Sequence, residues 1–151
     1  LERFNKAPFA KNGLLNYEAI SKYAQKIVDA FDVRAGQGCS TLARSLSGGN
    51  QQKAIIGREI ELNPDLLIAV QPTRGLDVGS IEYIHKRLID QRDKGKAVLL
   101  VSLELDEILN VSDRIVVINN GECIGTVDAK DTNENEIGLM MAGVKGDVKH
   151  A

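Results

Sequence analysis

Apolar and polar residues follow the period of an α-helix in the first half of this chain. Over residues 16–32, the apolar positions that share one face are Ile20, Ala24, Ile27, Val28 and Phe31. Asn16 is suited to cap this helix, because its side chain can accept a hydrogen bond from a free N–H of the first turn. A second pattern, from Asn50 to about Leu62, carries Ala54, Ile55, Ile56 and Ile60 and predicts a well-buried helix. The run Asn63-Pro64-Asp65 ends it, since proline cannot continue a helix.

Two continuous apolar runs predict strands in the middle of the chain. Residues 66–70 and 97–103 are short, apolar and bounded by turn residues, which is typical of strands buried on both faces. Residues 79–94 between them have the helical period, and Gly95 ends that helix. A strand, a helix and a strand in this order predict a right-handed βαβ unit with parallel strands.

The last third of the chain predicts a β-hairpin between two short helices. Asn119-Asn120-Gly121 is a strong turn signal between the runs 114–118 and 122–127. The short helices are expected over residues 104–110 and 134–141. The predicted fold class is therefore α/β, with a parallel βαβ unit followed by a β-hairpin and a terminal helix.

The two ends of the chain carry weaker patterns. Residues 1–15, with Pro8 and Gly13, are expected to be irregular, and the tail after Gly143 is expected to fray. Because the predicted sheet has few strands, we also expect it to expose an apolar edge where further strands would sit. The first residue is Leu1, which favours a piece excised from a longer polypeptide.

Composition is that of one soluble globular domain. The chain has 151 residues, 43% of them hydrophobic and 26% charged, which suits one domain with a core better than two. A net charge of −2 gives no general attraction to nucleic acid or anionic lipid. Cys39 and Cys123 lie far apart and outside metal-ligand spacing, as expected of reduced thiols in the cytosol. No apolar stretch reaches the roughly 20 residues of a membrane-spanning helix, so any membrane role is expected to run through a partner.

The run Leu-Ser-Gly-Gly-Asn-Gln-Gln-Lys at residues 46–53 is the most informative motif. Gly48 and Gly49 have no Cβ, so a phosphate can approach their backbone N–H groups closely. The helix expected from Asn50 would direct the positive end of its dipole to the same place. A plain glycine-rich junction between loop and helix is the alternative for a bare Ser-Gly-Gly. No Gly-x-x-x-x-Gly-Lys-Ser/Thr loop occurs, so the chain is expected to hold half of a nucleotide site.

Two motifs in register resemble those of the ABC-type ATPases. Residues 46–53 resemble the signature motif of that family. Residues 66–77, Leu-Leu-Ile-Ala-Val-Gln-Pro-Thr-Arg-Gly-Leu-Asp, resemble its Walker B strand and D-loop in the order and spacing that the family requires. Within this family, the particular residues found in both motifs most resemble those of the tandem ATP-binding subunits of simple-sugar and nucleoside importers. Gln71 favours the nucleoside branch, which is linked to basic membrane lipoproteins.

The resemblance covers nearly all of residues 1–145 and implies the C-terminal part of the second nucleotide-binding domain of such a subunit. Residues 1–45 would then be the helical subdomain and the loop that leads to the signature. Residues 46–145 would hold the signature helix, the Walker B strand, the D-loop and the C-terminal core, and residues 146–151 would be a tail.

The resemblance also implies that the signature acts in trans, on ATP held by the P-loop of the opposite domain. Ser47 would donate its hydroxyl to the γ-phosphate, and the start of the helix would stabilise the phosphate charge. The nucleotide-binding residues implied in this way are Ser47, Gly48, Gly49, Asn50 and Gln51, the last as a support of the loop. The D-loop residues implied at the domain–domain interface are Gly75, Leu76 and Asp77. Asp77 would equally serve as an N-cap of the following helix, and both roles are compatible.

The catalytic positions of the family are replaced in this chain. Val70 stands where the family has its magnesium-associated aspartate, and valine has no oxygen ligand for a hard cation. Gln71 stands at the catalytic glutamate, and glutamine cannot accept a proton near neutral pH. Leu103 stands at the switch histidine, and neither His85 nor His150 replaces it. We therefore expect no catalytic residue and no metal ligand here. ATP and Mg²⁺ would serve the full-length protein, with none bound to this segment, which alone would be inactive.

The function predicted from these motifs is to supply the signature to the ATP site of a partner domain in an importer. The implied partners are the first nucleotide-binding domain of the same chain, transmembrane permease subunits and, indirectly, an extracytoplasmic solute-binding protein. The implied location is peripheral, at the cytoplasmic face of the membrane. A soluble ABC-type ATPase acting on nucleic acid is one alternative. Three tyrosines, three phenylalanines, no tryptophan and a negative net charge oppose it. A vestigial structural ABC domain is the other alternative, opposed by the intact signature.

Overall fold

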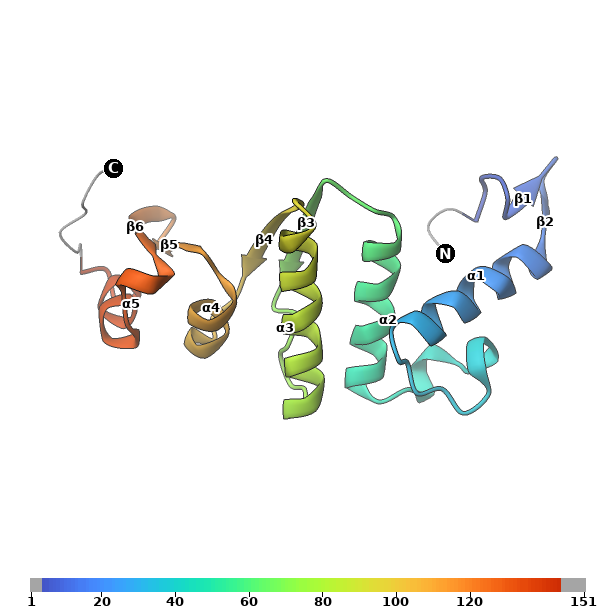
Figure 1. The fold of residues 1–151 in the computed structure, drawn as a ribbon, viewed down its shortest axis with the longest axis horizontal. Coiled ribbons are helices and arrows are strands. Elements are labelled where there is room, and N and C mark those ends of the chain that lie inside the picture. Colours follow the sequence, from blue (N-terminus) through green and yellow to red (C-terminus); the bar gives the residue numbers. More distant parts are fainter. Residues whose placement is uncertain (1–3, 145–151) are drawn as a thin grey trace. The chain divides into compact units, whose positions relative to one another are not determined.

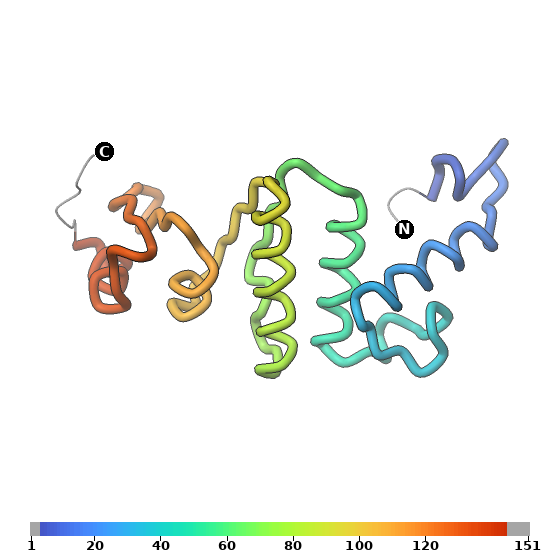
Figure 2. The backbone as a smooth tube through the Cα atoms, viewed as in Figure 1, coloured from blue at the N-terminus to red at the C-terminus, as the bar shows by residue number. Residues whose placement is uncertain are grey.

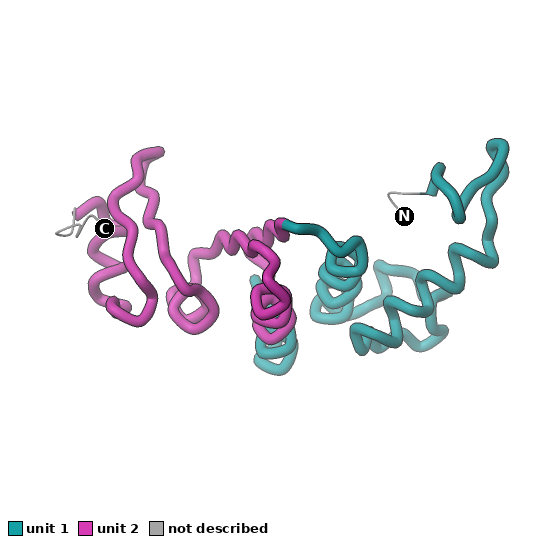
Figure 3. Tube along the Cα trace, turned by 45° about the horizontal axis from the view of Figure 1, so that its top comes forward, with its two compact units in different colours: residues 1–65, 73–84 teal, residues 66–72, 85–151 magenta. Residues whose placement is uncertain are grey.

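The computed structural model describes residues 4–144, drawn as a ribbon in Figure 1 and as a backbone tube in Figure 2. Two compact units are distinguished: residues 1–65 with 73–84, and residues 66–72 with 85–151 (Figure 3). The predicted tail, residues 146–151, lies outside the described residues. Among those described, no helix is both long and apolar enough to cross a membrane.

The first unit begins with a small β-hairpin that the sequence pattern did not predict. Strands β1 (Ala10–Lys11) and β2 (Leu14–Leu15) pair antiparallel, so the expectation of an irregular segment over residues 1–15 is wrong at this point. The turn residues Asn12 and Gly13 have φ angles of 51° and 79°. Asparagine and glycine adopt this left-handed conformation at little cost, and it is the one that a two-residue hairpin turn needs.

Helix α1 (Tyr17–Ala30) confirms the first predicted helix and its cap. The Asn16 side-chain oxygen accepts a hydrogen bond of 3.1 Å from the backbone N–H of Ala19. The end of α1 packs on the second helix, α2 (Gly48–Glu61), in a cluster formed by Ile27, Phe31, Val33, Tyr23, Val28, Leu46, Ala54 and Ile60. The two helices approach closely at Gly57, where a Cβ atom would lie 2.7 Å from the ring of Phe31.

Helix α2 begins earlier and is less buried than the sequence suggested. Two short 3₁₀ turns, η1 (Gly38–Ser40) and η2 (Ala43–Ser45), precede it. The helix starts at Gly48 rather than near Asn50, because the Ser47 side chain caps it. The expectation of a well-buried helix is wrong for Ile55, which is 46% exposed; the buried residues of α2 are Gly49, Ile56 and Gly57.

The predicted βαβ unit is present, with β3 (Leu66–Val70), α3 (Val78–Asp93) and β4 (Ala97–Val101). The strands are parallel and pair from Leu66 with Ala97 to Val70 with Val101. Burial on both faces is contradicted, since alternate residues of β3 are exposed and β4 is at most half-buried. The reason is that, within residues 4–144, this sheet consists of these two strands alone. Strand β4 ends two residues before the predicted Leu103, because Ser102 Oγ accepts a hydrogen bond from the backbone N–H of Glu104, at the start of the next helix.

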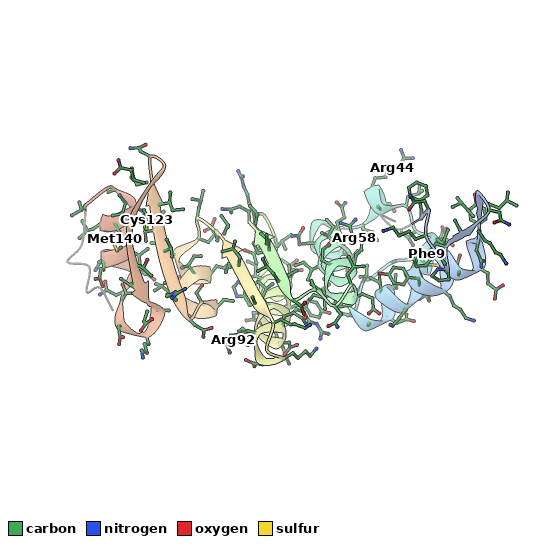
Figure 4. All side chains as sticks on the ribbon, turned by 90° about the horizontal axis from the view of Figure 1, so that it is seen from above. Phe9, Arg44, Arg58, Arg92, Cys123 and Met140 are labelled. Atoms are coloured by element: carbon green, nitrogen blue, oxygen red, sulfur yellow. The ribbon has the colours of Figure 1, made fainter. Side chains whose placement is uncertain are left out.

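The remainder of the second unit matches the predicted hairpin and helices. Helix α4 (Leu105–Val111) is followed by the antiparallel strands β5 (Arg114–Asn119) and β6 (Glu122–Asp128), a 3₁₀ turn η3 (Ala129–Asp131) and helix α5 (Glu134–Met141). Asn120 and Gly121 form the hairpin turn with φ angles of 48° and 81°. One buried cluster of this unit consists of Ile115, Val117, Ile124, Ile137 and Met140. Met140 and Cys123, a free thiol, are labelled in Figure 4. The predicted α/β class is confirmed.

Candidate functional site: the amino end of α2 and the turn before α3

The Ser47 hydroxyl is held at the amino end of α2 by Asn50. Ser47 Oγ accepts a hydrogen bond of 2.8 Å from the Asn50 side-chain amide and a longer one, 3.4 Å, from the Asn50 backbone N–H. Both bonds use lone pairs of the oxygen, so the hydroxyl hydrogen is left to donate. Ser47 is exposed, and next to it α2 begins with Gly48 and Gly49, whose N–H groups precede the first intrahelical hydrogen bond. An anion at this position would meet an O–H donor and the positive end of the helix dipole together.

The loop around this hydroxyl is braced from two sides. Asn50 Oδ1 accepts a hydrogen bond of 2.8 Å from the backbone N–H of Arg34, which ties α2 to the segment after α1. Gln51 Nε2 donates a hydrogen bond of 2.9 Å to the carbonyl oxygen of Leu46, which closes the loop in front of the helix. The donors at the amino end of α2 are therefore oriented before any ligand arrives.

An open depression of about 560 Å³ lies in front of Ser47 and Asn50. Its lining residues are Arg34, Gly36, Gln37, Thr41, Leu42, Ser45, Leu46, Ser47 and Asn50. Arg34 is a cation and the lining includes no acidic residue, so the depression suits a negatively charged group.

The two signature glycines have different surroundings. Gly48 is exposed, and a Cβ atom there would meet Leu76 at an ordinary contact distance of 3.6 Å. Gly49 is buried, and a Cβ atom there would overlap the hydroxyl of Ser80 and lie 3.0 Å from its Cβ atom. Gly48 is thus open to approach from outside, whereas the missing Cβ of Gly49 leaves room for α3. The sequence alone neither distinguishes the two glycines nor indicates Ser80, because only the fold brings Ser80 to the signature.

Asp77 in the turn before α3 binds Ser80 with both carboxylate oxygens. Oδ1 accepts a hydrogen bond of 3.0 Å from the Ser80 backbone N–H, and Oδ2 accepts one of 2.8 Å from the Ser80 hydroxyl. These bonds, the hydroxyl first, hold the pKa of Asp77 below its usual range. Asp77 therefore has the geometry of an N-cap. Nearby, Gly75 has a φ of 73°, a conformation that glycine adopts without strain, and the Leu76 N–H donates to the Thr73 carbonyl at 3.2 Å.

The positions expected to be degenerate lie in the second unit. Val70 is 62% exposed at the end of β3, and Leu103 is 70% exposed after β4. Gln71 has a φ of 49°, and its backbone N–H donates a hydrogen bond of 2.8 Å to the Val101 carbonyl. His85 Nε2 lies 3.0 Å from Glu107 Oε1, which links α3 to α4. Across residues 4–144, no group of His, Cys, Asp or Glu side chains has the arrangement of a metal site.

The structure thus brings the signature and the D-loop residues together in one unit. Gly48 faces Leu76, and Gly49 packs on Ser80, which is bonded to Asp77. The parallel strand pair with its crossover helix, and a glycine-rich turn opening a helix with free N–H groups, are the parts from which α/β nucleotide-binding domains are built.

Comparison with known proteins agrees with this description, although no family model matches the chain. The nucleoside import ATP-binding protein NupA of Lactococcus lactis subsp. cremoris is 59% identical over 143 residues, which are 95% of this chain and 28% of that protein. The guanosine import ATP-binding protein NupO of Bacillus subtilis is 57% identical over 143 residues, with the same coverage of 95% and 28%. The chain therefore spans little more than a quarter of the length of these curated relatives.

Solved structures show the same likeness. A nucleotide-free ATP-binding cassette from an ABC transporter superposes with a TM-score of 0.66 at 26% identity, covering 93% of this chain and 51% of that one. The ADP conformation of another ABC transporter cassette gives a TM-score of 0.64 at 26% identity, covering 89% and 51%. Fold and motifs together define part of an ATP-binding cassette. The chain belongs to the ABC transporter ATPase family, and its sequence is similar to the ATP-binding proteins of import systems.

Proposed function

We propose that this chain supplies the signature face of an ATP site whose P-loop belongs to a partner nucleotide-binding domain. The proposal rests on the hydrogen bonding of the Ser47 hydroxyl. Its oxygen accepts two hydrogen bonds from Asn50, so its hydroxyl hydrogen is available at the amino end of α2. The depression lined by Arg34 gives a γ-phosphate room to reach that donor.

In this role the chain acts by binding and orienting charge. Ser47 would donate to the γ-phosphate, while the N–H groups of Gly48 and the first turn of α2 stabilise its negative charge as the domains close. Bound ATP and Mg²⁺ would supply the phosphoryl group and its charge neutralisation in the full-length protein. Val70 offers no Mg²⁺ ligand, Gln71 offers no base and Leu103 offers no imidazole. A site built on these residues would therefore not hydrolyse ATP.

We further propose that the chain is the C-terminal part of the second nucleotide-binding domain of a tandem subunit. Its span of 28% of NupA and NupO supports this proposal. So do the exposed apolar residues Leu66, Ile68 and Val70, which more chain would cover. An apolar cleft of about 660 Å³, lined by residues of β4 and β5, is a second surface that additional chain would cover.

The relatives also guide the proposed biological role. NupA and NupO are named as nucleoside and guanosine import proteins, so a nucleoside is the solute class that we propose. The subunit would lie at the cytoplasmic face of the membrane and bind permease subunits through the helical subdomain, residues 1–45. Closure on ATP would drive the permease through that contact, and an extracytoplasmic solute-binding protein would deliver the nucleoside.

The test is steady-state ATP hydrolysis by the assembled transporter that contains the full-length subunit. Ser47→Ala should lower turnover roughly tenfold or more, because a hydrogen bond to a charged group contributes about 1.5–3 kcal/mol. Thr132→Ala is the control, since that hydroxyl donates to Glu136 Oε2 at 2.7 Å and Thr132 does not line the depression. ATP binding to the first domain is measured separately. Normal turnover of Ser47→Ala would contradict the proposed role in trans and would favour a vestigial structural domain instead.

A further inference from the structure

The second signature glycine is packed against the start of α3. Ser80 is 8% exposed, and its side chain occupies the space that a Cβ atom on Gly49 would need. The same Ser80 hydroxyl donates to Asp77 Oδ2 at 2.8 Å. One small side chain therefore contacts the signature on one side and the D-loop carboxylate on the other.

A second contact holds the two helices one turn further along. Lys53 of α2 places its Nζ atom 4.4 Å from the centroid of the Tyr83 ring in α3. The same Nζ atom lies 3.1 Å from Asp32 Oδ2, and the Lys53 side chain is 11% exposed. The spacing between the amino-terminal turns of α2 and α3 is thus set at two levels, first by Gly49 with Ser80 and then by Lys53 with Tyr83.

We propose that Ser80 is a positioning residue that joins the signature glycines to the Asp77 turn, so that both reach the partner's nucleotide as one rigid edge. This inference rests on the proposed function in trans. The two glycines then have different roles: Gly48 leaves space for the phosphate, and Gly49 leaves space for Ser80. An added Cβ at Gly49 would push the start of α3 away and move Asp77 with it, because packed interiors absorb even one methyl group poorly.

The experiment is a size-compensation test in the full-length subunit within the assembled transporter. Gly49→Ala should lower kcat about tenfold or more, because the overpacked side chains would disfavour the closed state that hydrolyses ATP. Gly49→Ala combined with Ser80→Gly should recover to within about threefold of Ser80→Gly alone, because the overlapping atoms are gone. Gly79→Ala is the control in the same turn, since its Cβ would meet Asp77 Oδ1 at an ordinary 3.5 Å.

A milder variant covers the case in which Gly49→Ala does not fold. Ser80→Ala keeps the Cβ atom that faces Gly49 and removes the hydroxyl, together with its bond to Asp77. It should lower kcat by about two- to fivefold, the effect of one lost hydrogen bond. ATP affinity of the open state should not change, because the P-loop lies in the other domain. A purely structural role would not produce this division between turnover and binding.

The outcomes separate this inference from the function on which it rests. Rescue by Ser80→Gly, together with the kcat effect of Ser80→Ala, supports the positioning role. If the double variant stays as defective as Gly49→Ala while Ser47→Ala is also defective, the trans site stands and the positioning role is wrong. If Ser47→Ala turns over normally, the proposed function fails, whatever the double variant does.

Discussion

The side-chain amide of Asn50 donates a hydrogen bond of 2.8 Å to the hydroxyl oxygen of Ser47. The direction of this bond decides what the serine can do. As long as Asn50 donates, the serine hydrogen points elsewhere and can be given to an incoming anion. A hydrogen-bond acceptor in place of the amide would draw that hydrogen back into the protein.

Asn50→Asp should therefore impair ATP hydrolysis at least as strongly as Ser47→Ala, roughly tenfold or more. The carboxylate still accepts from the Arg34 N–H, but it would take the Ser47 hydrogen and add a negative charge opposite the partner's phosphate. Steady-state turnover of the assembled transporter measures the effect. Asn133→Asp is the control, because Asn133 caps α5 through its side-chain oxygen and aspartate caps equally well. Wild-type turnover of Asn50→Asp would contradict the role given to Ser47.

Restoring the Walker B carboxylates should not by itself create a second active site. Val70→Asp and Gln71→Glu would return a metal ligand and a base to the end of β3. Leu103 would still lack the imidazole that contacts the γ-phosphate in the family. The expected result is little gain in ATP turnover from the pair and a clear gain when Leu103→His is added. A large gain from the pair alone would show that the histidine position has been misassigned.

The elements that the sequence predicted well are those with local signals. Asn16 caps α1 as expected, and the Asn120-Gly121 turn joins β5 to β6. Both signals depend on the chemistry of a few adjacent residues, which the sequence displays directly. The hairpin at Asn12 and Gly13 carries the same turn signal and was missed, because its strands are two residues each and have no alternating pattern.

The features that the sequence did not predict depend on contacts between distant segments. Nothing near Gly49 in the sequence indicates that Ser80 will lie against it, since that contact requires α2 and α3 to be packed first. The burial of β3 was overestimated for a related reason. A continuous apolar run indicates that both faces are suited to burial, but whether they are covered depends on neighbouring chain. The sequence motif of the candidate site could therefore be predicted. The directions of its hydrogen bonds and the different roles of Gly48 and Gly49 could not.

Two helical glycines should respond oppositely to alanine. Gly57→Ala would place its Cβ 2.7 Å from the Phe31 ring and 3.2 Å from Ile27, so we expect a loss of about 1–3 kcal/mol of unfolding free energy. Gly138 in α5 has no such neighbour within 4 Å among residues 4–144, so Gly138→Ala should stabilise by roughly 0.5–1 kcal/mol through helix propensity. Denaturant unfolding of the full-length subunit measures both. Equal effects of the two substitutions would mean that α1 and α2 do not pack closely at Gly57.

The last prediction concerns the acid titration of Asp77. Its pKa lies below the usual value chiefly because the Ser80 hydroxyl donates to the charged carboxylate, with the Ser80 backbone N–H second. A lowered pKa means that the cap contributes its full stability above the ordinary aspartate pKa of about 3.9 and loses it as the pH falls through the lower, folded-state pKa.

Ser80→Ala removes the first cause and leaves the second, so the pKa of Asp77 should rise toward its usual range without reaching it. The acid limb of the stability curve should then move to higher pH. Carbon-13 NMR titration of labelled aspartate carboxyl groups measures the change residue by residue. Asp32 is the internal control, because its pKa is lowered chiefly by a hydrogen bond from Lys53 and does not depend on Ser80. An unchanged pKa at Asp77 would mean that the Ser80 hydroxyl does not bond to it in solution, which would remove the link between the signature and the D-loop turn.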